Sequence, residues 1–122
     1  MMECELLETE RVAILRPAPE ARLLAEDFRR AAGRIDPFIE ATGPLNGVMM
    51  DARVFPGWRD GQAVWAHVGF IRRHQRQVGK VALVTDSRFL GLLWRLVRGL
   101  VRPDVRLFPY RERATALKWL AA

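Results

Sequence analysis

The sequence is poor in residue types on which cross-links and common catalytic sites depend. Its 122 residues include one cysteine, Cys4, so no disulfide can form within the chain and no zinc site can be built from several thiolates. Ser87 is the only serine, and it does not stand in the Gly-x-Ser-x-Gly pattern of a nucleophile elbow. Glycine-rich phosphate-binding patterns are also missing. We therefore expect no cofactor, no bound metal and no serine nucleophile.

Long apolar runs and a basic leader are missing as well. The longest apolar stretch, 89–101, is interrupted by Arg95 and Arg98 and is shorter than the ~18 residues that a transmembrane helix needs. The first residues, Met-Met-Glu-Cys-Glu, are acidic where a signal peptide would be basic. With 50% hydrophobic and 28% charged residues, the composition is that of a folded chain. The sequence predicts a soluble, cytoplasmic protein with a single domain over 1–122.

Basic residues outnumber acidic residues, and nearly all of them are arginines. The 20 basic and 14 acidic residues give a net charge of +6, and only Lys80 and Lys118 are lysines. Guanidinium groups suit phosphates and carboxylates. The arginines are scattered along the chain with no run longer than two, whereas nucleic-acid binders usually concentrate their charge. An anionic membrane surface is therefore favoured over nucleic acid as a partner.

The apolar pattern predicts strands and helices in the order ββαβαβαβα. Short apolar runs at 4–7 and 11–15 indicate two strands, and three- and four-residue spacing over 20–41 indicates a helix that Pro37 breaks or kinks. The later elements expected are strand 45–50, helix 61–77, strand 81–84, helix 88–102, strand 105–108 and a helix from Pro109. Strand and helix alternate from residue 45, which predicts an α/β fold with a mostly parallel sheet. In helix 61–77 the residues expected to face the sheet are Val64, Trp65, Val68 and Ile71.

Helix 88–102 carries more apolar side chains than one contact with a sheet requires. A narrow polar stripe is formed by Arg88, Gly91, Arg95, Arg98 and Arg102, and most other positions are apolar. The residues expected to pack on the sheet are Phe89, Leu93, Leu96 and Leu100. A second apolar flank beside Arg98 would then remain uncovered; it consists of Leu90, Trp94, Val97 and Val101. A neighbouring helix, a second subunit, a bilayer surface or an apolar ligand could cover this flank.

The two histidines, His67 and His74, are the other candidates for chemistry. They lie seven residues apart, whereas metal-binding pairs on a helix prefer a spacing of three or four, so we expect no shared metal. Asp51 and Asp86 each follow a predicted parallel strand, at the end of the sheet where ligands bind in open α/β folds. Both aspartates also suit helix caps. An enzyme that uses His67 or His74 with Asp51 is the least favoured hypothesis.

An ordered series of motifs resembles the SpoIIAA-like family of small bacterial proteins, a branch of STAS-type folds also likened to the CRAL-TRIO lipid-binding fold. The motifs are Phe55-Pro56-Gly57-Trp58, Ala63-Val64-Trp65, Phe70 with His74, 81–86, 105–108 and 116–120. The resemblance implies a four- or five-stranded sheet flanked by about four helices. It also implies a non-enzymatic binding module whose middle helices open an apolar cleft. Matching positions that could line the cleft are Trp58, Trp65, Phe70, His74, Leu90 and Trp94.

The same resemblance bears on phosphorylation. STAS domains that antagonise anti-sigma factors carry a phosphorylated serine at the start of a helix that corresponds to a position within 51–61. This stretch contains no serine or threonine, which argues against such a switch in this chain.

Two functions remain as hypotheses. The first is a non-enzymatic binding module for an apolar or amphiphilic ligand or an anionic membrane surface. Its predicted binding residues are Trp58, Trp65, Phe70, His74, Leu90, Trp94, Val97, Arg98 and Val101. The second is a homodimeric regulatory domain, in which the surplus flank of helix 88–102 closes a protein–protein interface.

Overall fold

The computed structural model describes residues 2–97 and 99–122, without the side chain of Val97. Its strands are β1 (Met2–Leu7), β2 (Val12–Pro17), β3 (Leu45–Asp51), β4 (Val78–Val84) and β5 (Asp104–Phe108). Its α-helices are α1 (Ala25–Thr42), α2 (Gly61–His74), α3 (Arg88–Val97) and α4 (Arg113–Ala121). Single 3-10 turns cover Gln75–Gln77 and Tyr110–Glu112. The predicted order of elements is confirmed.

The five strands form one sheet in the order β1-β2-β3-β4-β5. β1 runs antiparallel to β2, and every other neighbouring pair is parallel, as predicted. Each parallel connection passes through one helix, which is the right-handed crossover unit of α/β proteins. The predicted α/β fold class is therefore confirmed.

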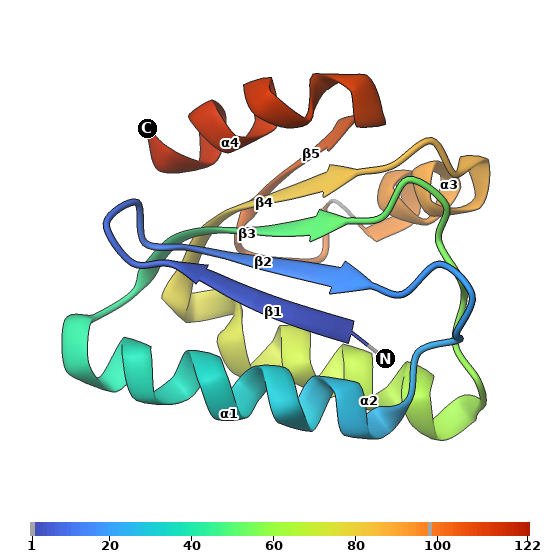
Figure 1. The fold of residues 1–122 in the computed structure, drawn as a ribbon, viewed down its shortest axis with the longest axis horizontal. Helices are drawn as coiled ribbons and strands as arrows, with labels where there is room; N and C mark the ends of the chain where they lie inside the picture. Colours follow the sequence, from blue (N-terminus) through green and yellow to red (C-terminus); the bar gives the residue numbers. More distant parts are fainter. Residues whose placement is uncertain (1, 98) are drawn as a thin grey trace.

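The helices cover the two faces of the sheet unequally. Figure 1 shows α1 and α2 side by side below the sheet and α4 above it. Alternate residues of the strands supply the two cores: Leu15 and Met50 pack toward α1, whereas Ile14 and Met49 pack toward α4. The face toward α4 is closed tightly, because a Cβ atom at Gly47 would lie 2.5 Å from Leu120 Cδ2.

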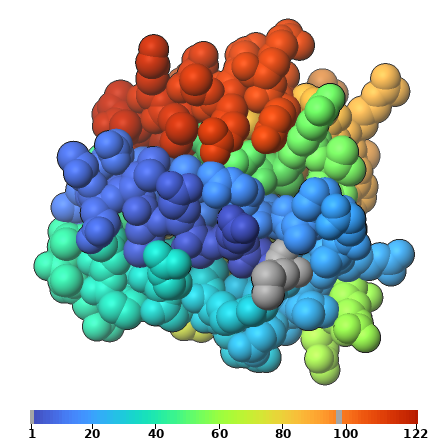
Figure 2. All heavy atoms as spheres, viewed as in Figure 1, coloured from blue at the N-terminus to red at the C-terminus, as the bar shows by residue number. Residues whose placement is uncertain are grey.

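Figure 2 shows one side of the molecule, over which the side chains of α4, the strands β1 and β2, and α1 follow one another from top to bottom. α3 lies on the same face of the sheet as α1 and α2. A Cβ at Gly91 of α3 would lie 3.5 Å from Leu107, and Leu107 is in register with Leu83, whose side chain packs in the core that α1 covers.

Helix α1 differs from its prediction at two points. It begins at Ala25, five residues after the predicted start, because Leu23 is held in a short parallel bridge to Trp58 and the Asp27 carboxylate accepts the Leu24 N–H at 2.8 Å. Pro37 does not break the helix, which continues to Thr42. Pro37 and Gly33, whose carbonyl loses its partner at the proline, are both exposed, so water can satisfy that carbonyl.

Helix α3 ends earlier than predicted. Its last residue is Val97 instead of Arg102, and Arg98 lies outside the described residues. Gly99 lowers the helix propensity at this point, and the residue before Pro103 is disfavoured in a helix. The chain therefore leaves the helix early and enters β5 at Asp104.

Candidate functional site

Helix α2 turns a different face to the interior from the one the sequence predicted. The residues expected to face the sheet, Val64, Trp65, Val68 and Ile71, are all more than one-third exposed, and Trp65 is 74% exposed. The inward positions are Ala63, Ala66, His67, Phe70 and His74. The prediction was wrong for Val64, Trp65 and Val68, because both faces of this helix carry apolar or aromatic residues, whereas Ile71 lines an apolar cavity that α2 forms with the sheet.

Aromatic contacts with α1 explain the orientation of α2. The ring of His67 stacks on Phe28, with centroids 4.6 Å apart and planes at 19°. Phe70 also contacts Phe28, at 6.0 Å, and packs on the ring of His74 at 4.4 Å. Rings prefer offset and tilted contacts, which favour particular packing angles. Such contacts stabilise the fold by more than the burial of their apolar area alone. The rings thus hold α2 on α1 instead of drawing it onto the sheet.

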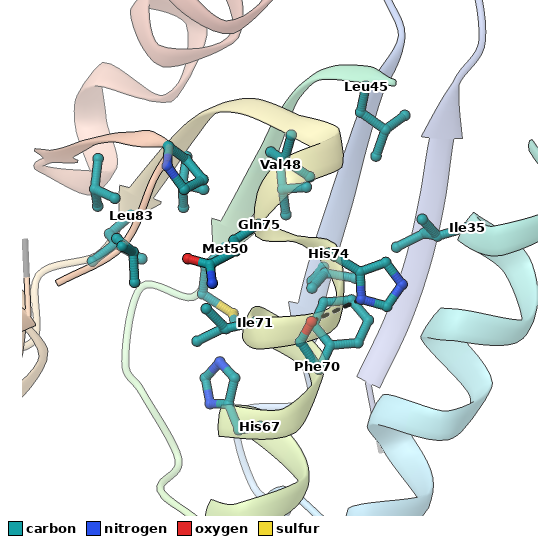
Figure 3. Close-up of a pocket in the computed structure, with 16 residues that line it drawn as sticks. Ile35, Leu45, Val48, Met50, His67, Phe70, Ile71, His74, Gln75 and Leu83 are labelled. Carbon is teal, nitrogen blue, oxygen red and sulfur yellow. Dashed lines mark hydrogen bonds between the residues drawn. The ribbon is translucent and has the colours of Figure 1, made fainter. Parts of the chain in front are cut away.

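An apolar cavity of about 150 Å³ lies between α2 and the sheet. Sixteen residues line it: Leu15, Ile35, Leu45, Val48, Met50, His67, Phe70, Ile71, His74, Gln75, Val78, Val81, Leu83, Val101, Pro103 and Val105. Figure 3 shows ten of them with labels, from strands, α1, α2 and the turn after α2. No lysine, arginine, aspartate or glutamate is among these described lining residues. The wall of the cavity is therefore mainly apolar, with His67, His74 and Gln75 as its polar side chains.

His67 is the polar group at one end of this cavity. Its Nδ1 accepts a hydrogen bond from Trp58 Nε1 at 3.1 Å, and its ring points into the cavity (Figure 3). Burial lowers the pKa of His67 from 6.5 to about 4, because the charged imidazolium would lose its water there. His67 is therefore neutral at pH 7.

His74 lines the same cavity but has both ring nitrogens engaged. Its Nδ1 lies 2.7 Å from the Phe70 carbonyl oxygen, and its Nε2 lies 2.6 Å from Asp36 Oδ1. Arg73 approaches the other carboxylate oxygen of Asp36 at 3.8 Å. His74 thus connects α2 to α1 and offers the cavity the face of its ring.

The enzyme hypothesis requires a histidine paired with Asp51, and neither histidine is hydrogen-bonded to it. Asp51 Oδ2 accepts hydrogen bonds from Arg16 Nε at 3.0 Å and Arg113 Nε at 2.8 Å. The two histidines have the partners Trp58, Asp36 and the Phe70 carbonyl instead. Over the described ranges, no group of three or more potential metal ligands comes together.

Helix α3 also packs with the opposite flank from the one predicted. Leu90, expected on the surplus flank, is 6% exposed, and Trp94 donates its Nε1–H to the Val105 carbonyl at 3.1 Å. Leu96 and Leu100, expected to contact the sheet, are 67% and 79% exposed. The surplus of apolar surface is real, but it lies on the other side of the helix. We call this exposed set the α3 row; it consists of Phe89, Leu92 and Leu96 of the helix and Leu100 of the turn that follows it.

The structure brings part of the predicted binding set together. Phe70, His74 and Val101 line the cavity, and Trp58 reaches it through His67. Trp65 points away from it, and Leu90 and Trp94 are on the packed side of α3 without lining the cavity. The predictions for the Val97 side chain and Arg98 fall outside the described residues.

Sequence reasoning missed most of the cavity wall. Alternation along two predicted strands could have identified the paired positions Val48 and Met50, and Val81 and Leu83. His67 was weighed only as a metal ligand or a catalytic residue, so its place at the cavity was not predicted.

A five-stranded, mostly parallel sheet with helices on both faces is the architecture of a STAS-type domain. A family model described as SpoIIAA-like matches residues 14–121, and the chain belongs to this family. Neither the curated proteins nor the solved structures yielded a match. Domains of this type are often regulatory and generally non-enzymatic. Within the described part of the chain, none of the helices combines the length and the apolar character needed to cross a bilayer.

Proposed function

We propose that this protein is a binding module that takes a small apolar molecule into the cavity between α2 and the sheet. The observation that supports the proposal is the cavity itself, with its volume of about 150 Å³ and a wall whose described residues include no lysine, arginine, aspartate or glutamate. Cavities of roughly this volume, when lined by aliphatic and aromatic side chains, stay dry and hold a molecule about the size of benzene. Filling such a space restores the dispersion contacts that its walls lack.

A cavity-filling substitution tests this proposal. Cumene, a neutral aromatic hydrocarbon, is expected to bind the wild-type protein with a dissociation constant of about 0.1–1 mM, measured by calorimetric titration. Val48→Phe places a ring in the cavity and is expected to abolish binding. Val64→Phe is the matched control, because the same substitution on the outer face of α2 leaves the cavity open. Unchanged binding to V48F, or no binding to the wild type, would refute the proposal.

A second candidate function is attachment to an anionic membrane, for which the α3 row is the supporting observation. Its members recur at three- and four-residue spacing and are each more than half exposed. Arg88 and Arg95 are exposed on the same helix, and the whole chain carries a net charge of +6. Apolar side chains beside arginines are typical of helices that lie in the interface of a membrane.

Co-sedimentation with lipid vesicles tests the membrane candidate. The wild type is expected to sediment with vesicles that contain phosphatidylglycerol and to dissociate as salt is raised. Leu96→Glu should reduce the bound fraction by about tenfold, since a carboxylate would enter the apolar layer. Ala114→Glu on α4 brings the same charge change to the opposite face of the sheet and should bind nearly as the wild type does. If light scattering instead shows a wild-type dimer that L96E converts to a monomer, the row is a dimer interface and this candidate fails.

A further inference from the structure

Two side chains that line the cavity, His67 and Gln75, offer hydrogen-bond donors, and the neighbouring Trp58 fixes the tautomer of His67. The indole N–H of Trp58 can only donate, so the Nδ1 atom of His67 that it contacts must carry a lone pair. A neutral imidazole has one N–H, and in His67 it must therefore be on Nε2. None of the hydrogen bonds described for this structure involves that Nε2 atom, and the ring points into the cavity (Figure 3).

The other polar side chains that line the cavity, His74 and Gln75, add no free hydrogen-bond acceptor. Both nitrogens of His74 already face oxygens of Phe70 and Asp36. The Oε1 atom of Gln75 accepts the backbone N–H of Arg102 at 3.2 Å, which leaves the amide nitrogen of Gln75 as a second donor. A ligand in the cavity thus meets hydrogen-bond donors on these side chains but no free side-chain acceptor.

The charge of the wall adds a second restriction. The described lining residues include no lysine or arginine, His74 turns both ring nitrogens to oxygens of Phe70 and Asp36, and the lowered pKa keeps His67 neutral at pH 7. An anionic carboxylate in this cavity would lose its hydration and gain no counter-charge, which is costly. An uncharged oxygen or nitrogen acceptor loses much less hydration free energy on entering the cavity, and it can accept a hydrogen bond from the Nε2–H of His67.

We propose that the cavity selects uncharged apolar molecules that carry a hydrogen-bond acceptor, such as a ketone or an ester, and that the Nε2–H of His67 donates to this acceptor. This inference rests on the proposed function, because it concerns the ligand of the same cavity. Trp58 is a positioning residue, since it holds the His67 tautomer without touching the ligand.

Three probes with nine non-hydrogen atoms each separate the possibilities: acetophenone carries a neutral acceptor, cumene carries none, and benzoate is an anion. The dissociation constants of acetophenone and cumene are measured for the wild type and for His67→Phe at pH 7. His67→Phe keeps a ring on Phe28 and removes the donor. It is expected to weaken acetophenone about tenfold and cumene less than about twofold. Benzoate is expected to bind the wild type at least about tenfold more weakly than acetophenone.

A measurement on the wild-type protein keeps the test independent of whether the variant folds. In ¹H–¹⁵N spectra of the imidazole, the Nε2–H resonance of His67 should move downfield with acetophenone and shift far less with cumene. Equal weakening of both probes by H67F, equal shifts with both, or benzoate binding as tight as that of acetophenone would overturn the inference. The absence of binding by both acetophenone and cumene would instead refute the proposed function.

Discussion

Asp51→Asn is expected to lower the free energy of unfolding by about 2–4 kcal/mol. Asp51 is 3% exposed, and one of its carboxylate oxygens accepts hydrogen bonds from Arg16 of β2 and Arg113 of α4. Loss of the carboxylate charge leaves two guanidinium groups without their buried partner. The effect is smaller than for a fully buried pair because both arginine side chains are about one-third exposed. The midpoint and slope of urea denaturation measure the change.

Glu5→Gln provides the control for this prediction. Glu5 pairs with the same Arg16 at 3.1 Å, but its side chain is 48% exposed, so its loss should cost less than about 0.5 kcal/mol. Equal effects of D51N and E5Q would show that Asp51 does not link α4 to the sheet.

Acidification from pH 6.5 to pH 4 is expected to remove about 3 kcal/mol of stability through His67 alone. The pKa of His67 is lowered to about 4 by burial in the folded protein and lies near 6.5 when the chain is unfolded. Between these values the unfolded chain binds a proton that the folded protein does not bind. The stability from the neutral ring is therefore fully present above pH 6.5 and is lost as the pH falls to 4.

Comparison with His67→Phe isolates this contribution, because carboxylates titrate over part of the same range. Urea denaturation at pH 7, 5.5 and 4.5 gives the slope of stability against pH for each protein. The wild type should lose about 2.4 kcal/mol more than H67F between pH 7 and pH 4.5. Parallel slopes would mean that the ring of His67 is hydrated in the folded protein, contrary to its contacts with Phe28 and Trp58.

The sequence predicted the strands, their order and the α/β class, because these depend on local signals. Short apolar runs between turns mark strands, and alternation of strands with helices determines a parallel sheet. The start of α1 was missed because the extended segment before it depends on a contact with Trp58, 35 residues further along the chain. Contacts of this kind have no local signature.

The site was less predictable because α2 and α3 each carry two faces that could be buried. In α3 the choice depends on the approach of Gly91 to Leu107 and on the Trp94 hydrogen bond to Val105. In α2 it depends on rings of α1 that the periodicity of α2 does not reveal. A hydrophobic pattern shows how much apolar surface a helix has, but when two flanks are similar it does not show which flank meets the sheet.

Methyl NMR of the wild-type protein during titration with cumene tests the ligand-binding account most directly. We predict saturable shifts at the methyl groups of Val48, Leu83 and Val101, which line the cavity, and none at Leu120 of α4, which packs on the opposite face of the sheet. Shifts confined to Leu92 and Leu96 of the α3 row, or no saturable shift at any of these positions, would contradict the account.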